Sequence, residues 1–210
     1  MIAGRRDHAV ASDAELSTTI RAFVACPLPG DARRLAIDLQ QRFQRAGLPL
    51  RPTPENVLHV TAFFIGAVEY GRALEFWEKA VPAMEHLRPS FQRTAGVICL
   101  PEGPSPRVVC LRLEGDPGLR RLHGLLADAA TRSGIRVDRR PFLAHATIAR
   151  VRQPSPPNLG GVVGRLHDEL AFAPRDPEPC DRVILYRSDL GPGGPRYTEL
   201  SSTHLGGTAG

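Results

Sequence analysis

Two short segments of this 210-residue chain share a pattern of histidine and threonine that could carry out acid–base chemistry. They are His59-Val60-Thr61-Ala62 and His145-Ala146-Thr147-Ile148. Each lies in an apolar stretch that predicts a strand, in which side chains two residues apart point to the same face. Each strand would therefore present one imidazole and one hydroxyl together. Two such strands around one cleft could deprotonate and protonate a bound phosphate while the hydroxyls hold its oxygens.

The two His-Thr segments lie 86 residues apart, and similar segments recur elsewhere at the same offset. Arg21–Cys26 falls opposite Arg107–Arg112, and Val97–Leu100 falls opposite Val183–Tyr186. We therefore predict an internal duplication, at a period too long for a solenoid repeat. Each half would run strand, helix, His-Thr strand, helix, strand. The alternative is that alternating strands and helices match at this offset by chance.

Hydrophobic periodicity and turn residues divide the chain into alternating strands and helices. The predicted strands are Thr19–Cys26, Val57–Ile65, Phe91–Leu100, Arg107–Leu113, Phe142–Arg150, Asp181–Arg187 and Arg196–Leu200, and the predicted helices are Asp31–Arg45, Tyr70–Ala80, Leu119–Arg132 and Val162–Leu170. Strict alternation along the first His-Thr strand places Val60, Ala62 and Phe64 toward the core. Along the second strand it places Ala146 and Ile148 there.

The composition is ordinary for a globular chain, with 42% hydrophobic residues and a formal net charge of +5. No apolar run is long enough to span a bilayer, and the N-terminus lacks the apolar core of a signal peptide. Every basic residue except Lys79 is arginine, which favours an anionic partner such as a nucleic acid or nucleotide, although composition bias explains the arginines equally well. We expect a flexible leader over residues 1–19, a single bilobal domain over 20–202 and a disordered tail over 203–210.

The four cysteines lack the Cys-x-x-Cys spacing of zinc sites. Three of them lie in predicted strands, where a thiol packs as a small hydrophobe, so we expect a reduced protein in the cytoplasm. A metal is the main competing use of the two histidines, but zinc requires further ligands. Neither His-Thr strand contains an aspartate, glutamate or cysteine. We therefore expect no metal and no cofactor.

The His-Thr pairs and their flanks resemble the RNA 2′,3′-cyclic phosphodiesterase family, historically named as 2′-5′ RNA ligases, of the two-histidine phosphoesterase superfamily. The segments that carry the resemblance are Arg21–Ala25, Leu58–Gly66, Arg140–Arg150, Leu185–Leu190 and Tyr197. The resemblance implies a bilobal α+β fold with two antiparallel sheets facing a central cleft, helices outside and a pseudo-twofold relation between the halves. It also implies metal-independent hydrolysis of RNA or oligonucleotide 2′,3′-cyclic phosphate ends to 2′-phosphomonoesters.

The catalytic roles implied by the resemblance fall on the two His-Thr pairs. Acid–base chemistry alone allows either histidine to act as the base or as the acid. The resemblance favours His145 as the base that activates water and His59 as the acid that protonates the O3′ leaving oxygen. Thr61 and Thr147 would then hold the nonbridging phosphate oxygens.

Three further residues are candidates for substrate binding. Arg150, five residues after His145, matches a family arginine that touches phosphate, although a surface arginine is the alternative. Strict alternation places Arg150 on the core face, so this role requires a bend in the strand. Phe63 and Tyr197 are candidates for stacking on a nucleobase, with core packing as an equal alternative for both.

Three other functions fit part of the pattern. A reversible 2′-5′ RNA ligase would run the reverse reaction, which must compete with bulk water. A non-catalytic RNA-binding module on the same fold would not need two complete His-Thr pairs. A metal-dependent hydrolase would lose activity on chelation. The expected partners are RNA ends or small cyclic nucleotides, and we expect a monomer with no membrane or protein partner.

Overall fold

A computed structural model describes residues 12–115, 117–138, 140–170, 177–191 and 194–206. Its strands are β1 (Thr19–Pro27), β2 (Leu50–Pro52), β3 (His59–Glu69), β4 (Ser90–Leu100), β5 (Val108–Gly115), β6 (His145–Val151), β7 (Glu178–Cys180), β8 (Arg182–Gly191) and β9 (Gly194–His204). The helices are α1 (Asp13–Leu16), α2 (Gly30–Arg45), the 3-10 turn η1 (Glu55–Val57), α3 (Tyr70–Glu85), α4 (Gly118–Arg132) and α5 (Leu159–Asp168). The mixed α+β class implied by the resemblance is confirmed, and no helix in these ranges has the length and apolar character needed to cross a bilayer.

The sheet is antiparallel and repeats itself about its centre. The strand order is β7-β4-β5-β6-β3-β1-β8-β9, with β2 paired to β6. The triplet β4-β5-β6 therefore mirrors β8-β1-β3, as the predicted duplication requires. The two triplets are joined where β3 pairs with β6, and the one registered pair there is Val60 with Ala146. These residues are 86 positions apart, so the pseudo-twofold axis runs between them. The two sheets that the resemblance implies are therefore joined into one continuous sheet by the pairing of β3 with β6.

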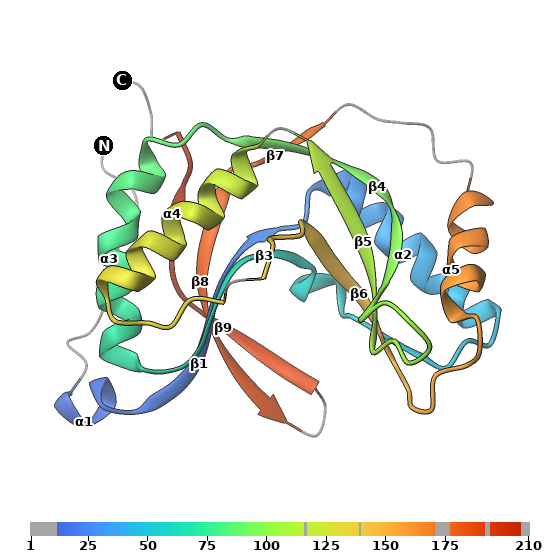
Figure 1. The fold of residues 1–210 in the computed structure, drawn as a ribbon, viewed down its shortest axis with the longest axis horizontal. Helices are drawn as coiled ribbons and strands as arrows, with labels where there is room; N and C mark the ends of the chain where they lie inside the picture. The colour runs from blue at the N-terminus through green and yellow to red at the C-terminus, as the bar shows by residue number, and fades with distance from the viewer. Residues whose placement is uncertain (1–11, 116, 139, 171–176, 192–193, 207–210) are drawn as a thin grey trace.

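The helices cover the sheet in two pairs, and each pair contains one helix from each half of the chain. Figure 1 shows α3 beside α4 at the left and α2 beside α5 at the right. Helix α2 comes from the first half but packs against β6, whereas α4 comes from the second half and packs against β3. The buried stripe of α2, Leu35, Leu39 and Phe43, has the four-residue spacing of an amphipathic helix. This exchange of helices ties the two halves together.

The repeat offset differs between strands by one residue. Cys99 on β4 pairs with Val109, and Leu185 on β8 pairs with Val24, so β4 and β8 keep the predicted offset of 86. In contrast, Val24 on β1 corresponds to Val109 on β5, which is an offset of 85. The predicted match of Arg21–Cys26 with Arg107–Arg112 is therefore wrong by one position. Shifting an alignment of two strands by one residue matches side chains on opposite faces of the sheet. Only the offset of 85 therefore matches residues of β1 and β5 that lie on corresponding faces.

The ends of the chain carry more structure than the sequence suggested. Ser12 and Glu15 form a capping box: the Glu15 carboxylate accepts from the Ser12 backbone N–H at 2.9 Å, and the Ser12 hydroxyl accepts from the Glu15 N–H at 3.3 Å. This box starts α1 inside the expected flexible leader, whose residues 1–11 lie outside the described ranges. At the other end, β9 continues to His204 and Leu205 is buried, so only residues 207–210 of the expected tail remain undescribed.

Candidate active site

The pairing of Val60 with Ala146 determines how the four polar side chains of the His-Thr segments meet. In an antiparallel pair, positions on either side of a registered pair lie opposite one another. His59 therefore lies level with Thr147, and Thr61 lies level with His145. All four side chains are partly exposed, whereas Val60 and Ala146 are fully buried. The strands thus place two imidazoles and two hydroxyls on the one face that points away from the core.

Both imidazoles are held by the same local hydrogen bond. His59 Nδ1 lies 2.7 Å from the Val57 carbonyl oxygen, and His145 Nδ1 lies 2.8 Å from the Leu143 carbonyl oxygen. A carbonyl can only accept, so each Nδ1 carries the proton and donates it. Each Nε2 is then left to exchange a proton with a ligand. The two acceptors are themselves 86 residues apart, so the repeat extends to the hydrogen bonds.

A bulge follows the His-Thr pair in β3. Thr61 pairs with Ala25 and Phe63 pairs with Val24, so the intervening Ala62 has no registered partner on β1. An extra residue of this kind reverses the alternation beyond it. Ala62 and Phe63 are consequently both buried, and Phe64 is 65% exposed. The expectation that Phe64 faces the core is therefore wrong.

The same bulge occurs in β6. Thr147 pairs with Cys110 and Ala149 pairs with Val109, so Ile148 is the unpaired residue. Arg150 turns outward as a result and is exposed. The bend that a phosphate-binding Arg150 requires is therefore present. The seven residues of β6 and the first seven of β3 have the same order of buried and exposed positions.

Each bulge is held from behind by a side chain of the helix exchanged from the other half. His123 of α4 lies with Nδ1 2.8 Å from the Ala62 carbonyl oxygen. Gln40 of α2 donates from Nε2 to the Ile148 carbonyl oxygen at 2.8 Å. His123, for which no sequence pattern predicts an interior position, also stacks on Phe142 at a centroid distance of 4.7 Å. Since the bulges turn Phe64 and Arg150 outward, these two clamps help to position the site.

Comparisons with known proteins find related sequences and a similar fold. A family profile described as LigT like Phosphoesterase matches residues 113–197. The RNA 2′,3′-cyclic phosphodiesterase of Thermotoga maritima is 26% identical over 182 residues, covering 86% of this chain and 93% of the relative. The enzyme of the same name from Thermus thermophilus is 28% identical over 199 residues, covering 91% and 93%. The crystal structure of TT0787 from Thermus thermophilus superposes with a TM-score of 0.73 at 25% identity, covering 90% of this chain and 99% of that one.

Sequence and fold thus both resemble those of LigT-like phosphoesterases. The apo structure of E. coli LigT shares the fold as well, with a TM-score of 0.66 at 23% identity over 90% of this chain and 99% of that one.

One predicted base-stacking residue lies away from the His-Thr face. Phe63 is 3% exposed and stacks on Phe76 of α3, with ring centroids 5.9 Å apart. The bulge at Ala62 is the physical reason, because it turns Phe63 into the core. Phe63 is thus a core residue, and the base-stacking prediction for it is wrong.

Tyr197, the other predicted stacking residue, lies beside His59. Its ring is 5.4 Å from the imidazole and 4.9 Å from Phe23, edge-on to both. Phe23 also stacks on Tyr186 at 5.3 Å and lies 6.3 Å from Phe64. Sequence reasoning missed Phe23, Phe64 and Tyr186. The signal that could have found them is the register, since Phe64, Phe23 and Tyr186 are successive cross-strand partners.

The electrostatics of the His-Thr face favour a neutral His59 in the free protein. Burial lowers the pKa of His59 below its ordinary 6.5, the hydrogen bond with the Val57 carbonyl opposes this, and the charge of His145 lowers the pKa further. Beside Thr147, burial raises the pKa of Cys110 to about 11, so its thiol stays protonated. The Cys110 Sγ lies 3.6 Å from the Thr147 hydroxyl.

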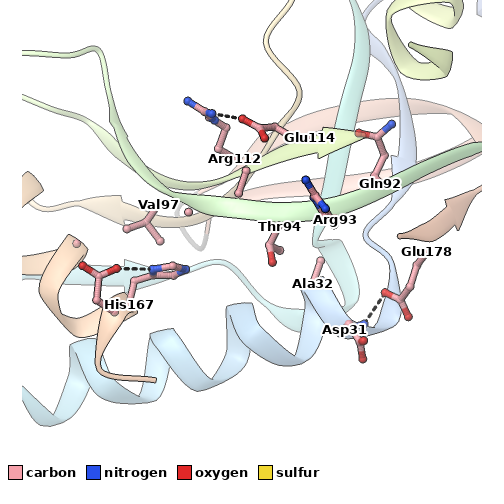
Figure 2. Close-up of a pocket in the computed structure, with 14 residues that line it drawn as sticks. Asp31, Ala32, Gln92, Arg93, Thr94, Val97, Arg112, Glu114, His167 and Glu178 are labelled. Carbon is pink, nitrogen blue, oxygen red and sulfur yellow. Dashed lines mark hydrogen bonds and ion pairs between the residues drawn. The ribbon is translucent and has the colours of Figure 1, made fainter. Parts of the chain in front are cut away.

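A separate hollow of about 590 Å³ lies between β4, β5 and the helices α2 and α5 (Figure 2). Arg112 pairs with Glu114 along its rim, and His167 of α5 pairs with the neighbouring Asp168 at 3.1 Å. Neither His59 nor His145 lines this hollow. Its one histidine has no second imidazole opposite, so it does not offer the acid–base pair that the His-Thr face provides. Within the described ranges, no group of three or more histidine, cysteine or acidic side chains could hold a metal ion.

The effect of His145 on His59 predicts a measurable coupling between the two imidazoles. Replacing His145 with Ala should raise the pKa of His59, because a nearby like charge is removed. Titration of the His59 Cε1–H signal by NMR would measure this change. His167→Ala serves as the control and should leave the pKa of His59 unchanged. An unchanged His59 pKa in His145→Ala would show that the imidazoles are too far apart to share a ligand.

The His123 clamp predicts a graded loss of stability. His123→Ala should lower the free energy of unfolding by about 1–3 kcal/mol, because the Ala62 carbonyl loses its side-chain donor. His123→Gln should lose less, because the Gln40 amide already fills this role at Ile148. Urea unfolding of both variants would measure the difference. Equal losses in the Ala and Gln variants would mean that the hydrogen bond is not what His123 contributes.

Proposed function

We propose that this protein hydrolyses RNA or oligonucleotide 2′,3′-cyclic phosphate ends to 2′-phosphomonoesters without a metal ion. The observation that carries the proposal is the matched pair of imidazoles, each with its Nδ1 proton tied to a backbone carbonyl and its Nε2 left for the substrate. The relatives named RNA 2′,3′-cyclic phosphodiesterase support the general activity. The paired histidines supply the base and the acid that opening a cyclic phosphodiester requires.

In the proposed reaction, His145 Nε2 removes a proton from a water molecule as the water oxygen bonds to phosphorus. The bond from phosphorus to O3′ breaks, and His59 Nε2 delivers its proton to that oxygen. The bond to O2′ remains, so the product is a 2′-phosphomonoester and both imidazoles have exchanged protonation states. The aromatic rings around His59 support this assignment, because the ribose that carries O3′ would lie on their side.

His59 must be protonated when it acts as the acid, although burial lowers its pKa in the free protein. A bound phosphate anion reverses this effect, because an opposite charge nearby favours the imidazolium. Substrate binding would therefore favour the protonated form of His59, which is the form that can act as the acid. Hydroxyls of Thr61 and Thr147 would donate to the nonbridging oxygens, and Arg150 would add a positive charge on the His145 side. Tyr197 would form part of the wall beside the ribose.

Replacement of either histidine tests the paired mechanism. His59→Ala and His145→Ala should each lower kcat by about 10²–10⁴-fold on an oligonucleotide with a 2′,3′-cyclic phosphate end. The double variant should be little worse than either single variant, because the groups act as a unit. His167→Ala, in the separate hollow, is the matched control and should keep full activity. Activity that depended on His167 and not on His59 would mean that the reaction takes place in the separate hollow and not at the His-Thr face.

Chelation tests metal independence. The described part of the chain offers no cluster of three metal-binding side chains, so turnover should persist after dialysis against EDTA. The comparison is the initial rate before and after dialysis, with zinc or manganese then added back. Loss of activity that either metal restores would replace this proposal with a metal-dependent hydrolase.

A further inference from the structure

The pseudo-twofold symmetry of the His-Thr face is broken beside its two threonines. Thr61 on β3 is the registered partner of Ala25 on β1. Thr147 on β6 is the registered partner of Cys110 on β5. Ala25 and Cys110 are 85 residues apart, the offset that relates β1 to β5, so they occupy equivalent positions in the two halves. One half therefore places a methyl group beside its threonine, and the other half places a thiol there.

The Cys110 thiol lies within hydrogen-bond distance of the Thr147 hydroxyl, with Sγ 3.6 Å from Oγ1. Cys110 is fully buried, whereas Thr147 is partly exposed, so the thiol lies behind the hydroxyl as seen from the solvent. Burial keeps the thiol protonated, and its S–H is a hydrogen-bond donor. A threonine hydroxyl carries one proton and two lone pairs, so it can accept from the thiol while it donates to a second group.

A phosphate anion at the His-Thr face would set the direction of this hydrogen bond. An anionic oxygen is a stronger acceptor than a thiol sulfur, so the Thr147 proton would turn toward the phosphate. The Cys110 S–H would then donate to the Thr147 oxygen, and hydrogen bonds in such a chain strengthen one another. On the other half of the face, the Ala25 methyl group has no proton to donate to Thr61.

We propose that Cys110 is a positioning residue that holds the Thr147 hydroxyl in the orientation in which it donates to the substrate phosphate. This inference rests on the proposed function. Cys110 acts through Thr147 and does not itself touch the phosphate. The two threonines are consequently unequal, because the Thr147 donor is oriented before the charge on the phosphate oxygens develops and the Thr61 donor is not.

The first test removes the thiol with and without its volume. Cys110→Ala and Cys110→Val should each lower kcat by about 2- to 10-fold on a 2′,3′-cyclic-phosphate oligonucleotide, as expected for loss of one neutral hydrogen bond. KM should change less, because the interaction strengthens as charge builds in the transition state. A loss in Cys110→Ala that Cys110→Val does not show would mean that the residue contributes only volume, which would overturn the proposal.

A double-mutant cycle tests whether the thiol acts through the hydroxyl. In a Thr147→Val background, Cys110→Ala should cause no further loss of kcat, whereas in a Thr61→Val background it should cause the full loss. Cys26 provides a matched control, because it is also a fully buried cysteine but pairs with Val60 and belongs to the hydrophobic core. Cys26→Ala should keep the wild-type kcat. Additive losses with Thr147→Val, or an equal loss in Cys26→Ala, would contradict the positioning role.

An infrared measurement separates this inference from the proposed reaction. The S–H stretching band of Cys110 is identified by its absence in Cys110→Ala. Inorganic phosphate should shift this band to lower frequency in the wild type, because the thiol becomes a donor, and Thr147→Val should abolish the shift. If no cyclic substrate is hydrolysed but the band shifts in this way, the proposed function fails and the positioning role stands. If hydrolysis requires both histidines but neither the band nor the kcat of Cys110→Ala changes, the positioning role fails and the proposed function stands.

Discussion

The candidate active site depends on one backbone pairing, between Val60 of β3 and Ala146 of β6. This pair joins two otherwise separate strand triplets and lies on the pseudo-twofold axis that relates them. Neither triplet alone contains two histidines. Because the pair fixes the register, a slip of one strand by one residue would turn its His-Thr pair into the core, away from the other His-Thr pair. Burial of those two residues therefore secures the chemistry on the opposite face.

The bulges add a second constraint, because they determine which side chains lie beside the proposed catalytic groups. The carbonyl of Ala62 lies beside His123, and that of Ile148 accepts from Gln40 in addition to the Thr53 backbone N–H. Gln40 and His123 supply these contacts from the exchanged helices, with different side chains for the same task. The helix exchange thus has a structural purpose beyond burying apolar surface. Each half of the chain supports the functional strand of the other half.

The sequence predicted the features that follow from local periodicity. The two strands, the shared face of His and Thr, and the order of elements in each half all come from alternation and helical spacing. Alternation could not locate the bulges, because these arise from pairing with β1 and β5 and from donors far along the chain. Phe63 and Phe64 show the consequence: two identical neighbours exchange their roles, and only the register decides which is buried. Likewise, His123 lies on a helix where nothing local indicates its contact with Ala62.

In the proposed mechanism, His59 and His145 act on one phosphate from opposite sides, with the nucleoside on the His59 side. The position of the product phosphate tests this arrangement most directly. Hydrolysis of a 2′,3′-cyclic-phosphate oligonucleotide in ¹⁸O-labelled water, followed by ³¹P NMR and mass spectrometry of the product, would determine this position. We predict a 2′-phosphomonoester alone, with one labelled oxygen per turnover. A 3′-phosphomonoester or a mixture of the two isomers would contradict the mechanism.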